Sequence, residues 1–152
     1  MADKLQFELV SPEKLLLSEP VGMVVVPGTE GNFGVLPGHA LLISTVRPGV
    51  LDVYADEPNA VTERIFVAGG FAEVTPERCT VLADEAVPIA SLERGDLDAE
   101  QKTLVASIDS LRDQLLRLAG ADREPALAQL AAAERRLAVV AAKLAVLIET
   151  AH

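Results

Sequence analysis

The sequence predicts a β-sandwich followed by an antiparallel hairpin of two α-helices, with the change of architecture between residues 88 and 98. Residues 1–90 hold eight of the ten glycines, eight of the nine prolines and all five aromatic residues, whereas residues 91–152 hold fourteen alanines. Apolar residues alternate with polar ones in the first part and recur every three or four positions in the second, as strands and helices require. We therefore predict two domains, a sandwich over residues 1–90 and a helical hairpin over residues 91–152.

The first part contains seven candidate strands separated by turn-forming residues. Residues 5–9 alternate between apolar and polar side chains, which is typical of a half-buried strand. Pro37-Gly38 and Gly69-Gly70 end neighbouring runs, because proline fixes φ and glycine admits positive φ. No helical stretch separates the runs, so we expect antiparallel pairing in a sandwich or barrel. The other candidate strands are residues 21–26, 40–46, 50–54, 63–68, 71–75 and 79–83.

The second part predicts two helices joined by a short loop. Asp96 or Asp98 is expected to cap the first helix, since a short carboxylate accepts hydrogen bonds from the amides of the first turn. Residues 119–122 end this helix, Pro125 fits the first turn of the second, and the second runs to about Ile148. So short a loop predicts an antiparallel hairpin. The apolar stripe of the first helix is Leu104, Ile108, Leu111, Leu115 and Leu118.

The seam of the hairpin is rich in alanine, which favours helix but buries little apolar area. Two helices alone therefore make a thin core, and the stability of the hairpin depends on what it packs against. Two interpretations remain open on this basis: a permanently docked helical appendage, or an arm with more than one docking site.

Composition and charge exclude several functions. Thirteen basic against 23 acidic residues give a formal charge of −10, which argues against a nucleic-acid partner and against docking on anionic lipid. No apolar run approaches the roughly 18 residues needed to span a bilayer, so we expect no direct insertion. The N-terminal segment resembles neither a secretory signal nor a transit peptide.

The sequence offers no convincing catalytic, cofactor or metal site. One cysteine and two histidines are too few for a disulfide or a typical zinc site, and Cys79 is expected to be a small buried hydrophobe. Residues 28–34 are rich in glycine but lack the Lys-Ser/Thr pair of a phosphate-binding loop, so turn formation explains them better. An enzyme using His39 and Asp84 is the weakest alternative, because no nucleophile pairs with His39.

Four segments in register resemble the epsilon subunit of bacterial F-type ATP synthases. The segment Gly-Val-Leu-Pro-Gly-His-Ala at 34–40 closely resembles a family motif, although Leu41 stands where the family often has proline. The resemblance continues through residues 46–50, 69–74 and 81–86, and the order of sandwich and hairpin also matches. It implies a non-catalytic central-stalk subunit that couples rotation of the proteolipid ring to ATP synthesis, peripheral on the cytoplasmic side of the bacterial inner membrane.

The resemblance also implies partners and candidate interface residues. The gamma subunit and the proteolipid c-ring are the expected partners of the sandwich, and the hairpin is expected to reach the alpha/beta catalytic head and inhibit it. In the family the hairpin either lies folded against the sandwich or extends into the head, and only the extended arrangement inhibits. By analogy the loop with Glu30, Asn32 and Phe33 rests on the ring, and His39 and its strand belong to the gamma-facing surface.

ATP is a conceivable regulatory ligand of the hairpin. Some family members bind ATP through a segment that resembles [I/L]-D-x-x-R-A, and here Leu97 and Asp98 match it. Gln101 and Lys102 replace the arginine and the alanine, and the loss of the guanidinium counts against ATP binding. The alternative to a stalk subunit is a free-standing β-sandwich binding module that dimerises through its hairpin.

Overall fold

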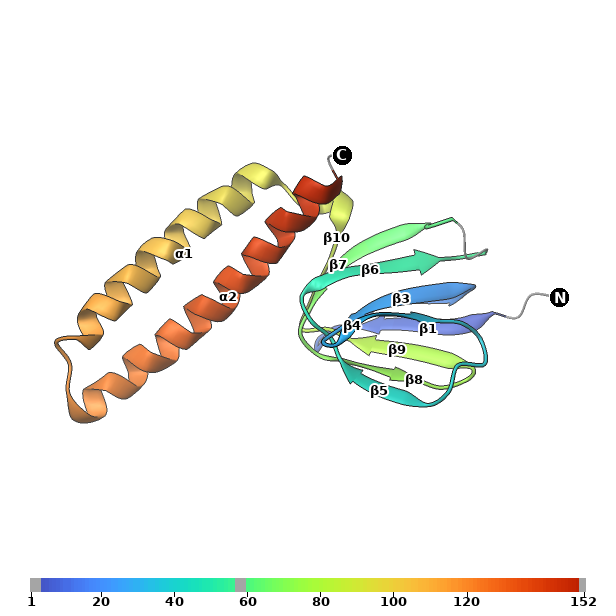
Figure 1. Ribbon diagram of the computed structural model, residues 1–152, viewed down its shortest axis with the longest axis horizontal. Helices are drawn as coiled ribbons and strands as arrows, with labels where there is room; N and C mark the ends of the chain where they lie inside the picture. The colour runs from blue at the N-terminus through green and yellow to red at the C-terminus, as the bar shows by residue number, and fades with distance from the viewer. Residues whose placement is uncertain (1–3, 57–59, 151–152) are drawn as a thin grey trace. The chain divides into compact units, whose positions relative to one another are not determined.

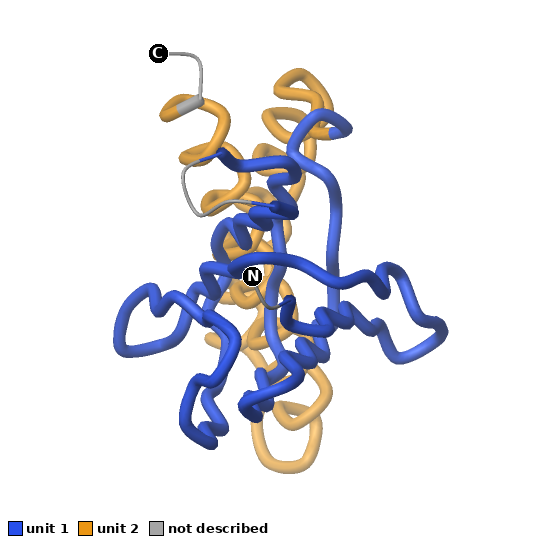
Figure 2. Tube along the Cα trace, turned by 90° about the vertical axis from the view of Figure 1, so that its right-hand side faces the viewer, with its two compact units in different colours: residues 1–91 blue, residues 92–152 orange. Residues whose placement is uncertain are grey.

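The computed structural model describes residues 4–56 and 60–150. The chain forms two compact units, residues 1–91 and residues 92–152, which Figure 2 draws in different colours.

The first unit is a sandwich of two five-stranded sheets, as predicted (Figure 1). Sheet 1 has the strand order β2-β1-β9-β8-β5, and sheet 2 has the order β10-β7-β6-β3-β4. A short 3-10 helix, η1 (Ile89–Ser91), follows the last strand. The strands are β1 Leu5–Val10, β2 Leu15–Val21, β3 Met23–Gly28, β4 Gly31–Val35, β5 Leu42–Thr45, β6 Gly49–Tyr54, β7 Glu63–Ala68, β8 Phe71–Val74, β9 Arg78–Leu82 and β10 Glu85–Pro88.

Three strands are absent from the sequence prediction, namely β2, β4 and β10, and all three lie at sheet edges. Each of the three buries at most one residue, so burial imposes no clear alternation on its sequence. Strand β2 carries Pro20 in its interior, which an edge tolerates because the missing amide is not needed there. The interpretation of residues 28–34 as a turn is corrected: only Thr29 and Glu30 turn, and Gly31–Val35 is strand β4.

One strand pair departs from the expected antiparallel arrangement. Strands β1 and β9 pair in parallel, with Phe7 opposite Cys79 and Leu9 opposite Val81. The two strands are separated by almost the whole sandwich, so the long connection that a parallel pair requires is available. The other strand pairs recorded in the described parts of the sheets are antiparallel.

The two sheets bury their inward-facing side chains against each other. Leu5, Phe7 and Leu9 alternate with half-exposed residues along β1, as the period of a strand requires. Cys79 is completely buried among them, and its burial raises the pKa of the thiol to about 12. The prediction that Cys79 is a small buried hydrophobe is confirmed.

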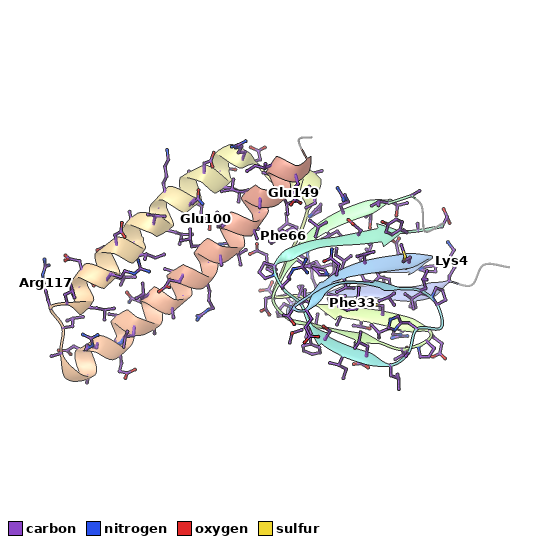
Figure 3. All side chains as sticks on the ribbon, in the orientation of Figure 1. Lys4, Phe33, Phe66, Glu100, Arg117 and Glu149 are labelled. Carbon is purple, nitrogen blue, oxygen red and sulfur yellow. The ribbon has the colours of Figure 1, made fainter. Side chains whose placement is uncertain are left out.

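The second unit is an antiparallel hairpin of α1 (Arg94–Leu115) and α2 (Arg123–Thr150), with a 3-10 turn, η2 (Gly120–Asp122), between them. Ile108 and Leu115 of the predicted stripe are buried. An ion pair between Arg136 Nε and Glu100 Oε2, at 2.7 Å, joins the two helices (Glu100 is labelled in Figure 3). The second helix extends two residues beyond the predicted end.

The ends of α1 differ from the prediction. Neither Asp96 nor Asp98 is the cap: α1 begins at Arg94, and Glu93 holds the cap position without a side-chain hydrogen bond. Asp96 lies in the first turn, where its charge favours the positive end of the helix dipole. At the other end α1 stops at Leu115, where Arg123 Nη1 donates to the carbonyl oxygen of Leu115 at 2.7 Å.

Candidate subunit-binding surfaces

An apolar row crosses the outer face of sheet 1. Its residues are neighbours in register on four adjacent strands: Phe71 of β8 lies opposite Leu82 of β9, Leu82 is paired with Val10 of β1, and Val10 with Leu15 of β2. Phe71 is 45% exposed and Leu15 is 54% exposed, although both are large apolar side chains. Large apolar side chains that are contiguous on a surface mark a site of protein association.

Strand β5 extends this surface at the edge of sheet 1. Ile43 is 73% exposed and lies opposite Glu73 of β8, two residues along the strands from the pair of Thr45 and Phe71. We call Ile43, Phe71, Leu82, Val10 and Leu15 together the apolar row. The sequence does not reveal this row as a surface, because Leu15 and Leu82 come to lie on either side of Val10 only through strand register.

The turn between β3 and β4 carries the residues predicted to contact the ring. Glu30 is exposed in the turn, Asn32 is exposed at the start of β4, and Phe33 is half-buried and packs against the sandwich core (Phe33 is labelled in Figure 3). The ring of Phe33 lies so close to Gly28 that a Cβ there would stand 2.9 Å from its Cε1. Phe33 therefore helps to hold the turn on the sandwich, while Glu30 and Asn32 are exposed.

His39 lies in the segment before β5, because that strand begins at Leu42 rather than at residue 40. Its amide donates to the carbonyl oxygen of Leu36 at 3.1 Å, and the ring nitrogen Nδ1 lies 2.7 Å from the carbonyl oxygen of Ala40. Residues 29 and 45 are hydrogen-bonded at the opposite end of β5. The structure therefore does not bring His39 together with Glu30, although β5 connects the two regions.

His39 and Asp84 also lie apart. The amide of Gly38 donates to the carbonyl oxygen of Pro76, beyond one end of β8, whereas Asp84 packs against Gly69 beyond the other end. Across residues 4–56 and 60–150, no group of three histidine, cysteine or acidic side chains could hold a metal ion. The geometry gives no support to an enzyme built on His39 and Asp84.

The two residues that match the ATP-binding motif lie at the start of α1. Leu97 is buried, and Asp98 Oδ2 lies 3.8 Å from Arg94 Nε, one helical turn earlier. Gln101 and Lys102 follow on the same helix, where an arginine would be needed to hold a phosphate.

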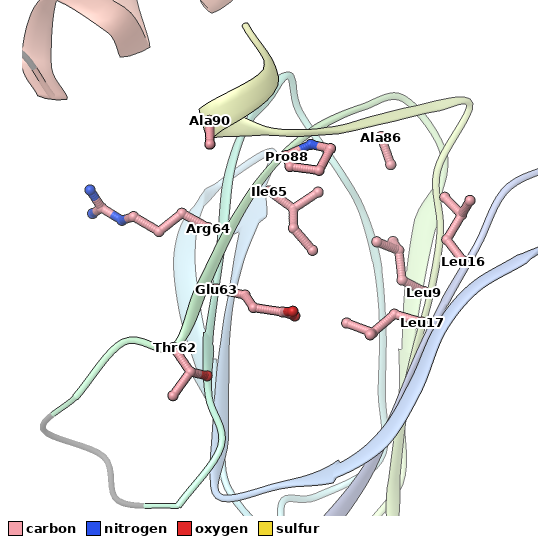
Figure 4. Close-up of a pocket in the computed structure, with 10 residues that line it drawn as sticks. All are labelled: Leu9, Leu16, Leu17, Thr62, Glu63, Arg64, Ile65, Ala86, Pro88 and Ala90. Carbon is pink, nitrogen blue, oxygen red and sulfur yellow. The ribbon is translucent and has the colours of Figure 1, made fainter.

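A cavity of about 450 Å³ opens between the edges of the two sheets (Figure 4). Leu9, Leu17 and Ile65 line it, and the carboxyl group of Glu63 lies among them. Burial raises the pKa of this carboxyl, and the nearby charge of Glu19 raises it further. Because the folded state favours the neutral carboxyl group, ionisation of Glu63 lowers the free energy of unfolding. The sandwich is therefore more stable at low pH and loses this stability as the pH rises through the folded-state pKa.

Comparisons with known proteins assign the chain to a family. Residues 4–89 match the family described as ATP synthase, Delta/Epsilon chain, beta-sandwich domain. The chain is 62% identical over 115 residues to the ATP synthase epsilon chain of Rhodospirillum centenum, covering 76% of each protein. It is 59% identical over 113 residues to that of Rhodospirillum rubrum, covering 74% of this chain and 81% of the relative.

The fold also resembles a solved structure. A chain in the cryo-EM structure of the Euglena gracilis mitochondrial ATP synthase, OSCP/F1/c-ring, superposes with a TM-score of 0.71 and 23% sequence identity, covering 95% of this chain and 81% of that one. At this identity the likeness concerns the fold alone. Among the described residues no helix is long and apolar enough to cross a bilayer. Since the family match covers more than half of the sequence and the relatives share well over 30% identity, the chain belongs to the family of ATP synthase epsilon chains.

Proposed function

We propose that this chain is a non-catalytic rotor subunit of a proton-translocating ATP synthase, which couples rotation of the proteolipid ring to ATP synthesis. The observation that carries the proposal is the exposed apolar row on the sandwich of an epsilon chain. The subunit lies at the cytoplasmic face of a bacterial inner membrane and is held there by its partners. Family membership favours this role over a free-standing module that dimerises through its hairpin.

The gamma subunit is the proposed partner of the apolar row. Burial of apolar area contributes about 25 cal/mol per Å², so side chains such as Phe71 and Ile43 gain most from a protein partner. Glu73 lies among them, opposite Ile43, and gives the surface one charge with which to fix the register of a partner. His39 lies just beyond the same edge strand, which makes it a border residue of this surface.

The proteolipid ring is the proposed partner of the turn between β3 and β4. The turn lies at the Thr45 end of β5, and Thr45 is the cross-strand neighbour of Phe71 in the apolar row. Glu30 and Asn32 are exposed there and Phe33 is half-buried beside them, so these three residues are the proposed contacts, and Phe33 also packs the turn against the core.

The test of the stalk role is co-purification from native membranes. A tagged full-length chain should recover gamma, alpha and beta subunits together with the ring in defined stoichiometry. In isolation the same chain should show a mass that does not change with concentration. A concentration-dependent dimer that recovers none of these subunits would instead indicate the free-standing module.

The hairpin is the proposed regulatory element, which hinders ATP hydrolysis when it reaches the alpha/beta head. Its helices bury few large side chains, and ion pairs such as Arg112 with Glu134, at 3.9 Å, are largely exposed. Exposed pairs contribute little to stability, so docking of the hairpin on a second surface would sacrifice little free energy. ATP is not proposed as a ligand, because Leu97 is buried and the motif arginine is replaced by Gln101.

Removal of residues 92–152 should raise ATP hydrolysis by the reconstituted head. The sandwich should fold without the hairpin, since its core cluster lies within residues 5–83. If the hairpin holds half or more of the complexes in the inhibited state, the rate should rise at least about twofold. Steady-state hydrolysis with and without the hairpin measures this, and equal incorporation of both forms is the control. An unchanged rate would mean that the hairpin does not inhibit hydrolysis, and the chain would then serve only in assembly and coupling.

A further inference from the structure

Arg47 ties the turn between β3 and β4 to the chain that crosses from sheet 1 to sheet 2. Its Nη1 donates to the carbonyl oxygen of Gly28 at 2.9 Å, and its Nη2 donates to Asn32 Oδ1 at 2.7 Å. One guanidinium therefore holds both sides of the turn, and its planar fork fixes their separation as a single ammonium could not.

Backbone hydrogen bonds reinforce this attachment. The amide of Arg47 donates to the carbonyl oxygen of Pro27 at 2.9 Å, and the amide of Thr29 donates to the carbonyl oxygen of Thr45 at 3.2 Å. The hydroxyl oxygens of Thr29 and Thr45 lie 2.9 Å apart, and Gly28 forms an isolated β-bridge with Val46. These contacts join the turn, which follows strand β3 of sheet 2, to the end of β5 in sheet 1.

The attachment places the turn next to the apolar row. Thr45 accepts the hydrogen bond from Thr29, and it is also the cross-strand partner of Phe71. Gly31, which directly follows the two turn residues and has a φ of 135°, would otherwise give the turn many accessible conformations. The side chain of Arg47 restricts them from outside the hairpin.

We propose that Arg47 is a positioning residue that holds residues 28–32 in one conformation against the end of β5, so that the turn and the apolar row move as one body. The proposal rests on the proposed function for the identity of the two partners, the ring for the turn and gamma for the row. A turn held in this way meets the ring without first being ordered, which lowers the entropic loss of binding.

The first test is amide hydrogen exchange by NMR on the full-length chain. In Arg47→Ala the amides of residues 29 and 47 should exchange at least about tenfold faster, because the hydrogen bonds they make attach the released turn. The amide of Gly38, which donates to Pro76 at the other end of β5, should exchange as before and shows that the sandwich is folded. In Arg47→Lys the exchange rates of these two amides should lie between those of the wild type and of Arg47→Ala, since lysine keeps the charge but not the planar fork.

The matched control is Arg64→Ala. Arg64 also pairs across strands in sheet 2, with its Nε 3.0 Å from Asp52 Oδ1, but its recorded partner lies outside the turn. This variant should leave the amides of residues 29 and 47 unchanged. Equal exchange in the wild type and in Arg47→Ala, or equal acceleration in both alanine variants, would overturn the positioning role.

Binding to the purified proteolipid ring then separates the inference from the proposed function. If residues 28–32 loosen and affinity for the ring falls several-fold in Arg47→Ala but not in Arg64→Ala, both are supported. If the turn loosens and affinity for the ring is unchanged, Arg47 still positions the turn and the ring contact is wrong. Asn32→Ala removes only one of the two side-chain bonds and should give a smaller loss of protection.

Discussion

The double variant Ile43→Lys with Phe71→Gln should bind the gamma subunit about 30- to 900-fold more weakly than the wild type. Truncating or replacing central apolar side chains of an interface removes about 2–4 kcal/mol of binding free energy, which corresponds to this range. Ile43 and Phe71 are 73% and 45% exposed, so the sandwich should retain its fold. The ammonium group introduced by Ile43→Lys would also lie opposite Glu73, where an opposite charge across strands is favourable. Isothermal titration with purified gamma measures the loss.

A matched control for this variant is Val61→Gln. Val61 is 41% exposed, close to the value for Phe71, but it precedes β7 in sheet 2 rather than lying on the apolar row. Its replacement should leave binding of gamma unchanged. Wild-type affinity in the double variant would show that gamma does not dock on the outer face of sheet 1.

Gly70→Ala should destabilise the sandwich by more than about 4 kcal/mol, enough to remove most of the stability of an ordinary domain. A Cβ at Gly70 would overlap the carbonyl oxygen of Leu82, so β8 and β9 would have to separate. Gly70 also has a φ of 92°, which an alanine adopts only with strain. Urea unfolding, or the yield of folded protein, measures the effect.

Gly38→Ala separates strain from collision in this experiment. Gly38 has a similar φ of 88°, but a Cβ there would meet no heavy atom within 4 Å. The free energy of unfolding of this variant should fall only by the cost of the backbone conformation, about 1–2 kcal/mol. Equal losses at both glycines would mean that the contact with Leu82 relaxes at little cost.

The internal strands could be predicted from the sequence because burial dictates their pattern. Strand β1 alternates between buried and half-buried residues, and β7 matches its predicted range of residues 63–68. Strands β2, β4 and β10 could not, since each buries at most one residue and so shows little of that pattern. The start of α1 was also misplaced. Glu93 holds the cap position without a side-chain hydrogen bond, and glutamate is not one of the residue types by which a cap is predicted from sequence.

The candidate surfaces were only partly accessible from the sequence. Glu30 and Asn32 are predicted ring contacts by resemblance alone, and the structure shows that both are exposed. The packing of Phe33 against the core could not be recognised, because it depends on the fold around Gly28. Arg47 is an ordinary arginine beside a proline in the sequence, and its two side-chain acceptors lie 15 and 19 residues away.

The amino-acid sequence was sufficient to establish the change from sandwich to hairpin and, through four motifs in register, the family. Local patterns carry that information, because the period of the apolar residues and the position of glycine and proline act over a few neighbours. The folded chain was needed to show that Val10, Leu15, Phe71 and Leu82 form one surface and that Arg47 fastens the turn beside it. Both depend on strand register between segments distant in the chain, and register is set by packing of the two sheets rather than by any local pattern.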